Sequence, residues 1–388
     1  MKIRAEAEGS QFRYNEHRKN HEDNGRDERR PAMKIQLGII GFGGMGKWHA
    51  ENAPRAGVEI TAVCDIDEGK QQEATAMGYR MYKTADDLLA DPEVNTVILT
   101  VPNHLHKEMC IKAARAGKNV ITEKPAAMDV AELDAMEAAC KEAGVFFTSH
   151  QNRRWDKDML IVKKAYDERL LGNIFTIESK LHSGNGYMHE WHIYKKYGGG
   201  MIYDWGVHLI DQILFMMPEA KVLSLYADIK NVLHEEVDDY FKIIMKMSNG
   251  VTAHIELSTY ILDYQPRWLA AGDKGTLVVK SFGCDGHLLR TGKLLEKLPP
   301  QITETEAGPT RQFAPVPPGG IEEFPLPEVK TDWLDFYRNV NGVLNGTEES
   351  VIKISEVRRV LAVMEAARKS AETGLAVEFE EAGEETGY

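Results

Sequence analysis

The sequence has few cysteines and no long hydrophobic run. Its four cysteines are Cys64, Cys110, Cys140 and Cys284, and no two of them form a C-x-x-C pair. This spacing favours neither a disulfide framework nor a zinc motif, and it predicts reduced thiols in a cytoplasmic protein. No apolar stretch reaches the roughly 20 residues that cross a bilayer, and the first residues lack the apolar region of a signal peptide. We therefore expect no membrane partner.

Positively charged residues are outnumbered. The chain has 47 lysines and arginines against 60 aspartates and glutamates, a net charge of −13. Nucleic-acid binding takes its affinity from clustered lysine and arginine, so this balance argues against nucleic acid and favours a small-molecule partner. Hydrophobic residues at 43% and charged residues at 28% are usual for a globular protein, and a length of 388 residues suits two domains.

Residues 1–32 differ in composition from the rest of the chain. They carry dense charge of both signs and almost no apolar periodicity. Such a segment buries too little apolar surface to offset the entropy of ordering, which predicts a disordered N-terminal extension. The alternative is an arm that packs on a neighbouring subunit. Met33 precedes the first strand-like run, so we place the start of the folded chain there.

Residues 33–150 alternate short apolar runs with helical stretches. The expected strands are Ile35–Ile40, Val58–Cys64, Val94–Val101, Asn119–Thr122 and Val145–Thr148. The expected helices are Met45–Pro54, Glu68–Met77, Ala85–Ala90, His104–Ala116 and Val130–Ala143. This alternation is typical of a parallel sheet covered on both faces, and it predicts an α/β domain of the Rossmann type.

Residues 151–388 have a different rhythm, with consecutive strand-like runs and little helix between them. The runs are Ile174–Leu181, Val222–Ile229, Tyr240–Met247, Val251–Leu257, Trp268–Ala271 and Leu277–Val279. The expected helices are Trp155–Leu171, Gly199–Met217, Trp333–Leu344 and Ser355–Thr373, and residues 298–327 are expected to form a surface loop. This pattern predicts an α+β domain with a large open mixed or antiparallel sheet, with the C-terminal helices free to pack back on the first domain.

A glycine-rich motif follows the first expected strand directly and precedes a helix. It is Gly41-Phe42-Gly43-Gly44-Met45-Gly46, which fits G-x-G-x-x-G. The first glycine permits a tight turn, the second lets the backbone approach a pyrophosphate, and the third lets helix and strand pack closely. Asp65 ends the second strand, where its carboxylate can bind ribose hydroxyls and would repel a 2′-phosphate. The alternative is a plain glycine turn, but both signals together predict NAD as cofactor, in preference to NADP.

Two further motifs carry groups suited to proton transfer. Glu123-Lys124-Pro125 follows an expected strand of the parallel sheet, at the edge where ligands collect, and Lys124 can donate to or accept from a substrate oxygen. In a helix, Asp204, His208 and Asp211 would share one face, where a carboxylate can orient the histidine ring. The alternatives are a surface lysine, a helix-capping aspartate and a core histidine.

The segment at 181–197 is rich in aromatic residues, histidine and glycine. It predicts a loop over the substrate, because aromatic faces pack on the C–H surfaces of sugars while histidines meet hydroxyls. The candidate substrate-binding residues are Arg153, Trp155, His182, Tyr187, His189, Trp191 and His192. A metal site at residues 189–192 is the rival interpretation, but the sequence is one residue short of H-E-x-x-H and offers no third ligand, so no metal is expected.

These motifs together resemble those of the Gfo/Idh/MocA oxidoreductases, which include glucose–fructose oxidoreductase and inositol dehydrogenase. The resemblance covers residues 34 to about 380 and rests on the glycine loop, Thr100-Val101-Pro102-Asn103-His104-Leu105-His106, Glu123-Lys124-Pro125 and the Gly-Gly-x-x-x-Asp-x-Gly-x-His-x-x-Asp run that contains Asp204 and His208. It implies a Rossmann domain plus an open sheet that mediates homo-oligomers, dimers or tetramers. It also implies that Lys124, Asp204 and His208 are catalytic, and that Thr100, Pro102, Asn103, His106, Glu123 and Lys124 join the glycine loop and Asp65 in binding the cofactor.

The resemblance implies oxidation or reduction at a hydroxyl of a sugar, polyol or glycoside, glycoside 3-oxidation included. In the expected mechanism His208 removes the hydroxyl proton, Lys124 hydrogen-bonds the same oxygen, and Asp204 orients the histidine. Two alternatives stay open at this point. One is an NAD-assisted glycoside-cleaving enzyme, and the other is a non-catalytic regulator of a sugar pathway that binds dinucleotide without turnover.

Overall fold

The computed structural model describes residues 33–292, 303–310 and 319–379. The described residues from Lys34 onward belong to one compact unit. The expected disorder of residues 1–32 falls outside the described residues. Within the described ranges, no helix combines the length and the apolar composition needed to span a membrane.

The first sheet is parallel, and its described strands number six in the order β3-β2-β1-β4-β5-β6. The strands are β1 Gln36–Ile40, β2 Glu59–Cys64, β3 Met81–Tyr82, β4 Thr96–Leu99, β5 Asn119–Thr122 and β6 Phe147–Ser149. The central strands are buried along their length, as a sheet covered on both faces requires. The strand order reverses between β1 and β4, which is where ligands of such sheets bind. The prediction of a Rossmann-type α/β architecture is confirmed.

Five helices connect the strands of this sheet: α1 Gly44–Asn52, α2 Glu68–Ala76, α3 Ala85–Leu89, α4 His106–Arg115 and α5 Val130–Ala143. Local sequence explains where they begin and end. Asp129 caps α5 by accepting a hydrogen bond from the Glu132 amide, and Gly144 ends the helix in the left-handed conformation. The same capping by an aspartate or a threonine begins α2 and α3.

The second sheet has nine strands among the described residues, in the order β16-β13-β12-β11-β7-β10-β9-β8-β17. Its strands are β7 Ile174–His182, β8 Val222–Lys230, β9 Tyr240–Met247, β10 Thr252–Ser258, β11 Trp268–Gly272, β12 Gly275–Val279, β13 Gly286–Thr291, β16 Ile321–Phe324 and β17 Val377–Glu378. Only β7 and β10 pair in parallel, so the sheet is mixed, as predicted. The expected surface loop at 298–327 is wrong in part, because Ile321–Phe324 pairs with β13 and a small hairpin forms from β14 Thr303–Thr305 and β15 Gly308–Thr310.

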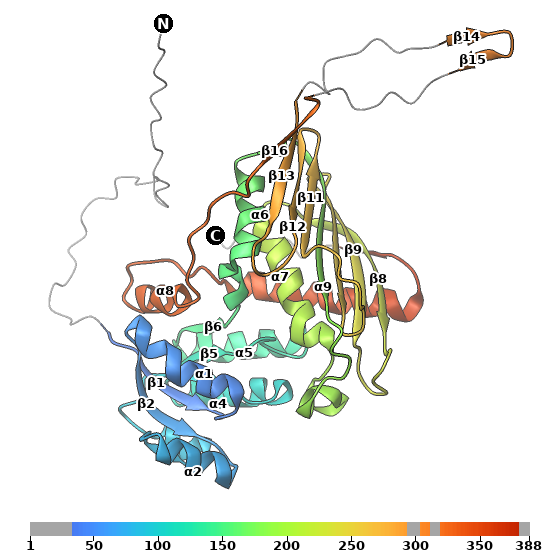
Figure 1. The fold of residues 1–388 in the computed structure, drawn as a ribbon. Helices are drawn as coiled ribbons and strands as arrows, with labels where there is room; N and C mark the ends of the chain where they lie inside the picture. The colour runs from blue at the N-terminus through green and yellow to red at the C-terminus, as the bar shows by residue number, and fades with distance from the viewer. Residues whose placement is uncertain (1–32, 293–302, 311–318, 380–388) are drawn as a thin grey trace, which may run out of the picture. The chain divides into compact units, whose positions relative to one another are not determined.

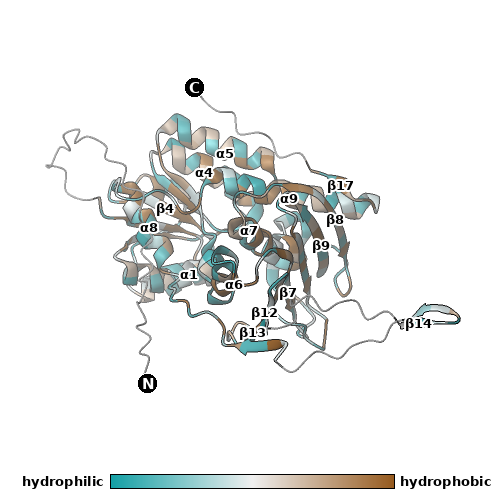
Figure 2. Cartoon of the chain, turned by 90° about the horizontal axis from the view of Figure 1, so that it is seen from above, coloured by the Kyte–Doolittle hydropathy of each residue, from teal (hydrophilic) through white to brown (hydrophobic). Residues whose placement is uncertain are grey.

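Helices cover one face of the second sheet. They are α6 Lys157–Asp167, α7 Val207–Met216 and α9 Ile354–Thr373, while α8 Asp335–Leu344 lies beside the first sheet (Figure 1). The apolar helix α7, brown in Figure 2, packs between α6 and α9. Along β9 and β10 buried and partly exposed residues alternate, so the opposite face of the sheet is uncovered.

The C-terminal helices join the two sheets. We call each sheet with its covering helices a layer. Helix α9 contacts α5 and β6 of the first layer as well as β8 of the second layer. A buried ion pair between Arg154 and Asp211 ties the entry to the second layer onto α7, and Arg154 also donates to Glu356 of α9. These contacts hold the two layers in one unit and fix the cleft between them. The domain boundary at residue 150 stays a prediction.

Candidate active site

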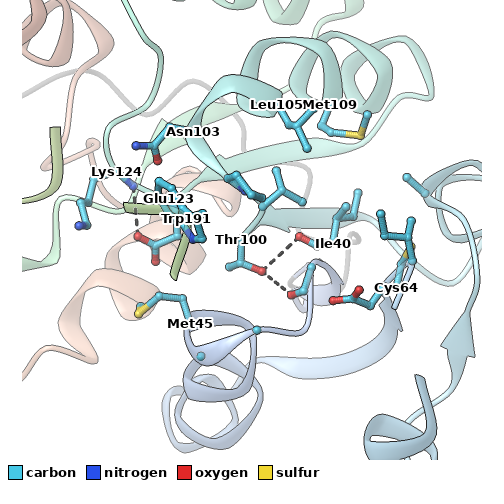
Figure 3. Close-up of a pocket in the computed structure, with 18 of the residues that line it drawn as sticks. Ile40, Met45, Cys64, Thr100, Asn103, Leu105, Met109, Glu123, Lys124 and Trp191 are labelled. Carbon is cyan, nitrogen blue, oxygen red and sulfur yellow. Dashed lines mark hydrogen bonds between the residues drawn. The ribbon is translucent and has the colours of Figure 1, made fainter. Parts of the chain in front are cut away.

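A cavity of about 820 Å³ lies at the carboxyl ends of β1, β2, β4 and β5 (Figure 3). It extends from Asp65 and Ile66 at one end to Lys124 and Asp204 at the other. It is long and lined by glycine backbone in its middle, which suits a dinucleotide placed at the switch point of a parallel sheet.

The glycine loop forms the floor of this cavity, and each glycine meets a different steric demand. Gly41 has φ +97°, a conformation that favours glycine. A Cβ atom on Gly43 or Gly44 would meet nothing within 4 Å, so the backbone there is open to a ligand at the N-terminus of α1. A Cβ atom on Gly46 would collide with the carbonyl oxygen of Gly41, so this glycine permits close packing of helix on strand.

The side chain of Phe42 is an exception among the residues predicted to bind the cofactor. It is fully buried and packs edge-on against Tyr79, so it supports the loop from behind and does not line the cavity. Met45, by contrast, is 38% exposed and does line it.

Asp65 lies at the far end of the cavity, at the carboxyl end of β2. One carboxylate oxygen accepts a hydrogen bond from the Phe42 amide at 2.6 Å, and the other accepts from the Asp67 amide at 2.9 Å. Asp65 therefore fixes the glycine loop as well as facing the cavity, and each oxygen keeps a lone pair for a ligand hydroxyl. Three neighbours at this end were not predicted from the sequence: Thr84, Asp86 and Lys112.

The loop after β4 forms the wall opposite the glycines. Thr100, Pro102 and Asn103 line the cavity, and the hydroxyl of Thr100 donates to the carbonyls of the first strand's end (Figure 3). The Asn103 amide donates to the Gly198 carbonyl at 2.8 Å, which links this loop to the second layer. His106, also predicted as a cofactor ligand, is not in the cavity. It is fully buried between the carbonyls of Pro125 and Val101, and burial lowers its pKa.

An ion pair closes the opposite end of the cavity. The Lys124 Nζ atom donates to Asp204 Oδ1 at 2.6 Å and to the Asp204 carbonyl at 2.9 Å. Burial alone would raise the pKa of Asp204, but the adjacent Lys124 outweighs it, and the pKa is lowered. Asp204 is therefore ionised, and because Lys124 uses two of its three ammonium protons on Asp204, one is left for another acceptor.

His208 lies one helical turn beyond this pair, behind the residues that line the cavity, and is 4% exposed. Its ring packs edge-on against the Trp205 ring, with centroids 5.8 Å apart. Among the described residues, none forms a hydrogen bond with the His208 ring. Burial lowers its pKa well below the usual value, and the charges of Lys124 and Arg153 lower it further. His208 is thus a neutral imidazole at neutral pH.

The sequence predicted that Asp204, His208 and Asp211 share one helical face, so that a carboxylate orients the His208 ring; this predicted orientation is wrong. Residues Ile202–Gly206 form a π-helical turn that changes the helix register before α7 begins. Asp204 consequently pairs with Lys124 and Asp211 pairs with Arg154, so neither carboxylate orients the His208 ring. The structure corrects the proposed role of Asp204 from orienting the histidine to holding the lysine.

Glu123 belongs to a buried hydrogen-bond network that the sequence did not reveal. Its Oε1 atom is 2.8 Å from His49 Nε2 and 2.8 Å from His150 Nδ1, and Tyr337 of α8 is 2.6 Å from the other nitrogen of His49. Among the described residues, His49, Glu123 and His150 are the group of three whose ligand atoms lie close enough to hold a metal. Hydrogen bonding alone accounts for these contacts, since two imidazole N–H groups donate to one carboxylate and the tyrosine hydroxyl donates to His49. It fixes the end of β5 from which Lys124 projects.

The predicted substrate-binding residues separate into three groups. Trp191 and His192 stack on each other at 3.9 Å and line the Lys124 end of the cavity. Arg153 and Trp155 line a neighbouring groove. The structure does not bring His182, Tyr187 and His189 to either cavity: His182 is covered at the end of β7, where its ring accepts from the Gln265 amide, while Tyr187 and His189 are exposed. The rival metal site at 189–192 gains no support among the described residues.

Comparison with known proteins identifies the class to which this fold and site belong. The model of an oxidoreductase family with an NAD-binding Rossmann fold, Gfo/Idh/MocA, matches residues 35–151, and the model of the Gfo/Idh/MocA C-terminal domain matches residues 159–278. The chain belongs to this family and is an NAD-binding oxidoreductase. The open backbone at Gly43 and Gly44 and the carboxylate of Asp65 fit this cofactor.

Three relatives illustrate the range of the family. An NAD-binding protein from Listeria innocua is 36% identical with a TM-score of 0.83, and the match covers 89% of this chain and 99% of that one. The scyllo-inositol 2-dehydrogenase (NADP(+)) of Bacillus subtilis is 26% identical over 88% of this chain and 95% of its own length. The WlbA dehydrogenase of Bordetella pertussis, solved with NADH and UDP-GlcNAcA, shares the fold at 23% identity and a TM-score of 0.71, over 90% of this chain and 100% of that one.

Proposed function

We propose that this oxidoreductase transfers hydride between NAD and a hydroxyl or ketone carbon of a sugar, polyol or glycoside. The observation that carries the proposal is the Lys124–Asp204 ion pair at the end of a dinucleotide-shaped cavity, with the unpaired imidazole of His208 one turn away. The names of an inositol dehydrogenase and of a dehydrogenase bound to a nucleotide sugar support a hydroxyl-rich substrate.

The bound NAD supplies the hydride acceptor, and the chain supplies proton transfer and orientation. Lys124 is fixed by two hydrogen bonds to Asp204, and its remaining proton is directed to the oxygen of the substrate carbinol. Because His208 is neutral, its free nitrogen accepts the hydroxyl proton as the C–H bond breaks, and the same proton returns when a ketone is reduced. Trp191 and His192 cover this end of the cavity, where they hold the sugar ring.

The balance of charges favours this division of roles. Asp204 is a carboxylate with a lowered pKa, and its ion pair with Lys124 holds the lysine in place as a hydrogen-bond donor. Burial, together with the positive charges of Lys124 and Arg153, lowers the pKa of His208 and makes it a weak base. The same positive charges stabilise the developing negative charge on the substrate oxygen. Proton removal and oxyanion stabilisation are therefore assigned to different groups.

The experiment is a panel of polyols, aldoses and glycosides assayed for NADH formation, followed by Lys124→Met and His208→Asn on the best substrate. Each variant is expected to lower kcat by about 10²–10⁴-fold, the usual contribution of an acid or base, with NADH affinity nearly unchanged. Lys141→Met is the matched control, because this lysine lies 71% exposed on α5, away from the cavity. Full turnover in both active-site variants, or no NADH from any sugar, contradicts the proposal.

A further inference from the structure

A second cavity, of about 600 Å³, lies beside the reaction centre, and of its lining residues only Arg153 enters the chemistry described above. Both layers contribute to it: helix α1, the segment before α6, the turn between β12 and β13, and the segment before α8. We call it the tryptophan groove, after its lining residues Trp48, Trp155 and Trp333, which Phe282 joins.

The aromatic rings of the groove are accessible yet fixed in place. Trp333 is 39% exposed, although its indole N–H donates to Asp156 Oδ1 at 3.0 Å, and Phe282 is 46% exposed. Trp48 lies against Trp333 with ring centroids 6.5 Å apart. The Arg153 guanidinium lies 5.8 Å from the centroids of both the Phe282 and the Trp333 rings, so it covers part of each ring. The exposed parts of these rings, in a concave site, mark a place for a ligand that packs on aromatic side chains.

The polar groups of the groove combine both signs of charge. Arg153 donates to Asp156 at 3.0 Å through one nitrogen, which leaves its other N–H groups available. Two further charges of each sign line the groove, from Arg55, Lys157, Asp158 and Asp332. A ligand with a single strong charge would be attracted by some of these groups and repelled by the others. Hydroxyl groups, in contrast, can donate hydrogen bonds to the carboxylates and accept them from the cationic groups.

The groove is linked to the reaction centre through Arg153 and Trp205. The Arg153 guanidinium lies 4.1 Å from the centroid of the Trp205 ring. The Trp205 ring in turn lies 5.8 Å from that of His208 and 6.2 Å from that of Phe282. Since Trp205 follows Asp204 directly, one aromatic side chain borders both the catalytic residues and the groove.

We propose that the tryptophan groove binds a second, neutral sugar ring of a glycoside whose first ring lies at Lys124 and His208. The second ring packs on Trp333 and Phe282, and its hydroxyls meet Arg153 and Asp332. This inference rests on the proposed function and makes it narrower, because the preferred substrates are glycosides with at least two sugar rings.

The test compares methyl glycosides with matched disaccharides such as maltose and cellobiose. Phe282→Ala and Trp333→Phe are expected to raise KM for the preferred disaccharide roughly threefold to tenfold, the usual worth of an aromatic contact, and to leave KM for the methyl glycoside unchanged. Tyr260→Ala is the matched control, because Tyr260 is 50% exposed and does not line the groove. Calorimetric titration of disaccharide into the NADH-bound protein gives the affinity without turnover.

Different results separate the failure of the inference from that of the proposed function. Equal changes for both sugars, or none for either, overturn the groove assignment while activity on the methyl glycoside preserves the proposed function. Disaccharide binding that weakens in both variants without NADH formation supports the groove and rejects the hydride transfer. A change in oligomeric mass with unaltered sugar affinity overturns the inference, because a second copy of the chain then occupies the groove.

Discussion

Substitution of two glycines in the same loop should affect stability differently, although both substitutions should weaken cofactor binding. Gly43 has φ −75° and ψ −158°, which any residue adopts, and an added Cβ meets nothing within 4 Å. Gly43→Ala should therefore leave the melting temperature unchanged or slightly raised. Alanine reduces the conformational entropy of the unfolded chain, which raises the free energy of unfolding by about 0.4–1 kcal/mol. The new methyl group nevertheless occupies the space at the start of α1 that a pyrophosphate needs.

Gly46→Ala places its methyl group against the carbonyl oxygen of Gly41 and 3.2 Å from the Thr100 hydroxyl oxygen. The Gly41 carbonyl belongs to the backbone and cannot rotate away, so α1 must move away from β1, at a cost of about 1–3 kcal/mol. We expect the melting temperature of Gly46→Ala to fall by several degrees, together with the affinity for NAD.

Thermal unfolding with and without NADH, and fluorescence titration of NADH, measure both effects. Gly43→Ala should weaken NADH binding at least tenfold, about 1.4 kcal/mol, at full stability. Gly44→Ala, whose added Cβ also meets nothing, is the companion variant. Wild-type NADH affinity in Gly43→Ala would refute the assignment of this loop to the pyrophosphate, whatever the stability shows.

Three further predictions concern cofactor choice, acid stability and assembly. In parallel titrations, NAD should bind at least tenfold more tightly than NADP, and Asp65→Asn should reduce this ratio of affinities, because a neutral amide no longer repels a 2′-phosphate. Equal affinities of the wild type for NAD and NADP would show that Asp65 does not select the cofactor. Burial lowers the pKa of His49 to about 4, so the unfolded chain takes up a proton that the folded chain refuses, and stability should fall by roughly 3 kcal/mol as the pH drops from about 6.5 to about 4. Urea unfolding at several pH values measures this loss, and His49→Gln should flatten the profile; an unchanged slope in the variant argues against it. We propose that the uncovered face of the second sheet forms the homo-oligomer: Tyr226→Lys and Ile244→Glu, which pair across β8 and β9, should lower the mass seen by light scattering, and an unchanged mass would place the interface elsewhere.

The sequence predicted the elements whose ends carry local signals. Helix Val130–Ala143 was predicted to the residue, because its capping aspartate and terminal glycine are visible in the chain. Strand β13 was missed, since Gly286–Thr291 has no clear alternation, and β16 was hidden in a proline-rich stretch. Its pairing with β13 is a long-range contact that no local pattern encodes.

The candidate site was predictable where one motif acts alone and not where motifs meet. Lys124 and Asp204 were both predicted, but the ion pair between them joins residues 80 positions apart. The π-helical turn broke the assumed helical period, which is why the partner of Asp204 was misassigned. The His49–Glu123–His150 network and the tryptophan groove depend on packing between layers, and no spacing in the sequence points to them.

The hydrogen bond from Asn103 to Gly198 and the salt bridge from Lys124 to Asp204 both cross between the layers. A nucleotide-binding half expressed by itself would consequently keep its cofactor loop and lose its chemistry. The same holds for a chimera that joins this nucleotide-binding half to the second half of a relative. The chimera would function only if the new half supplied a carboxylate for Lys124 and a backbone carbonyl for Asn103. We therefore expect Lys124 and Asp204 to be replaced together or not at all, whereas residues away from the contact between the layers can vary independently.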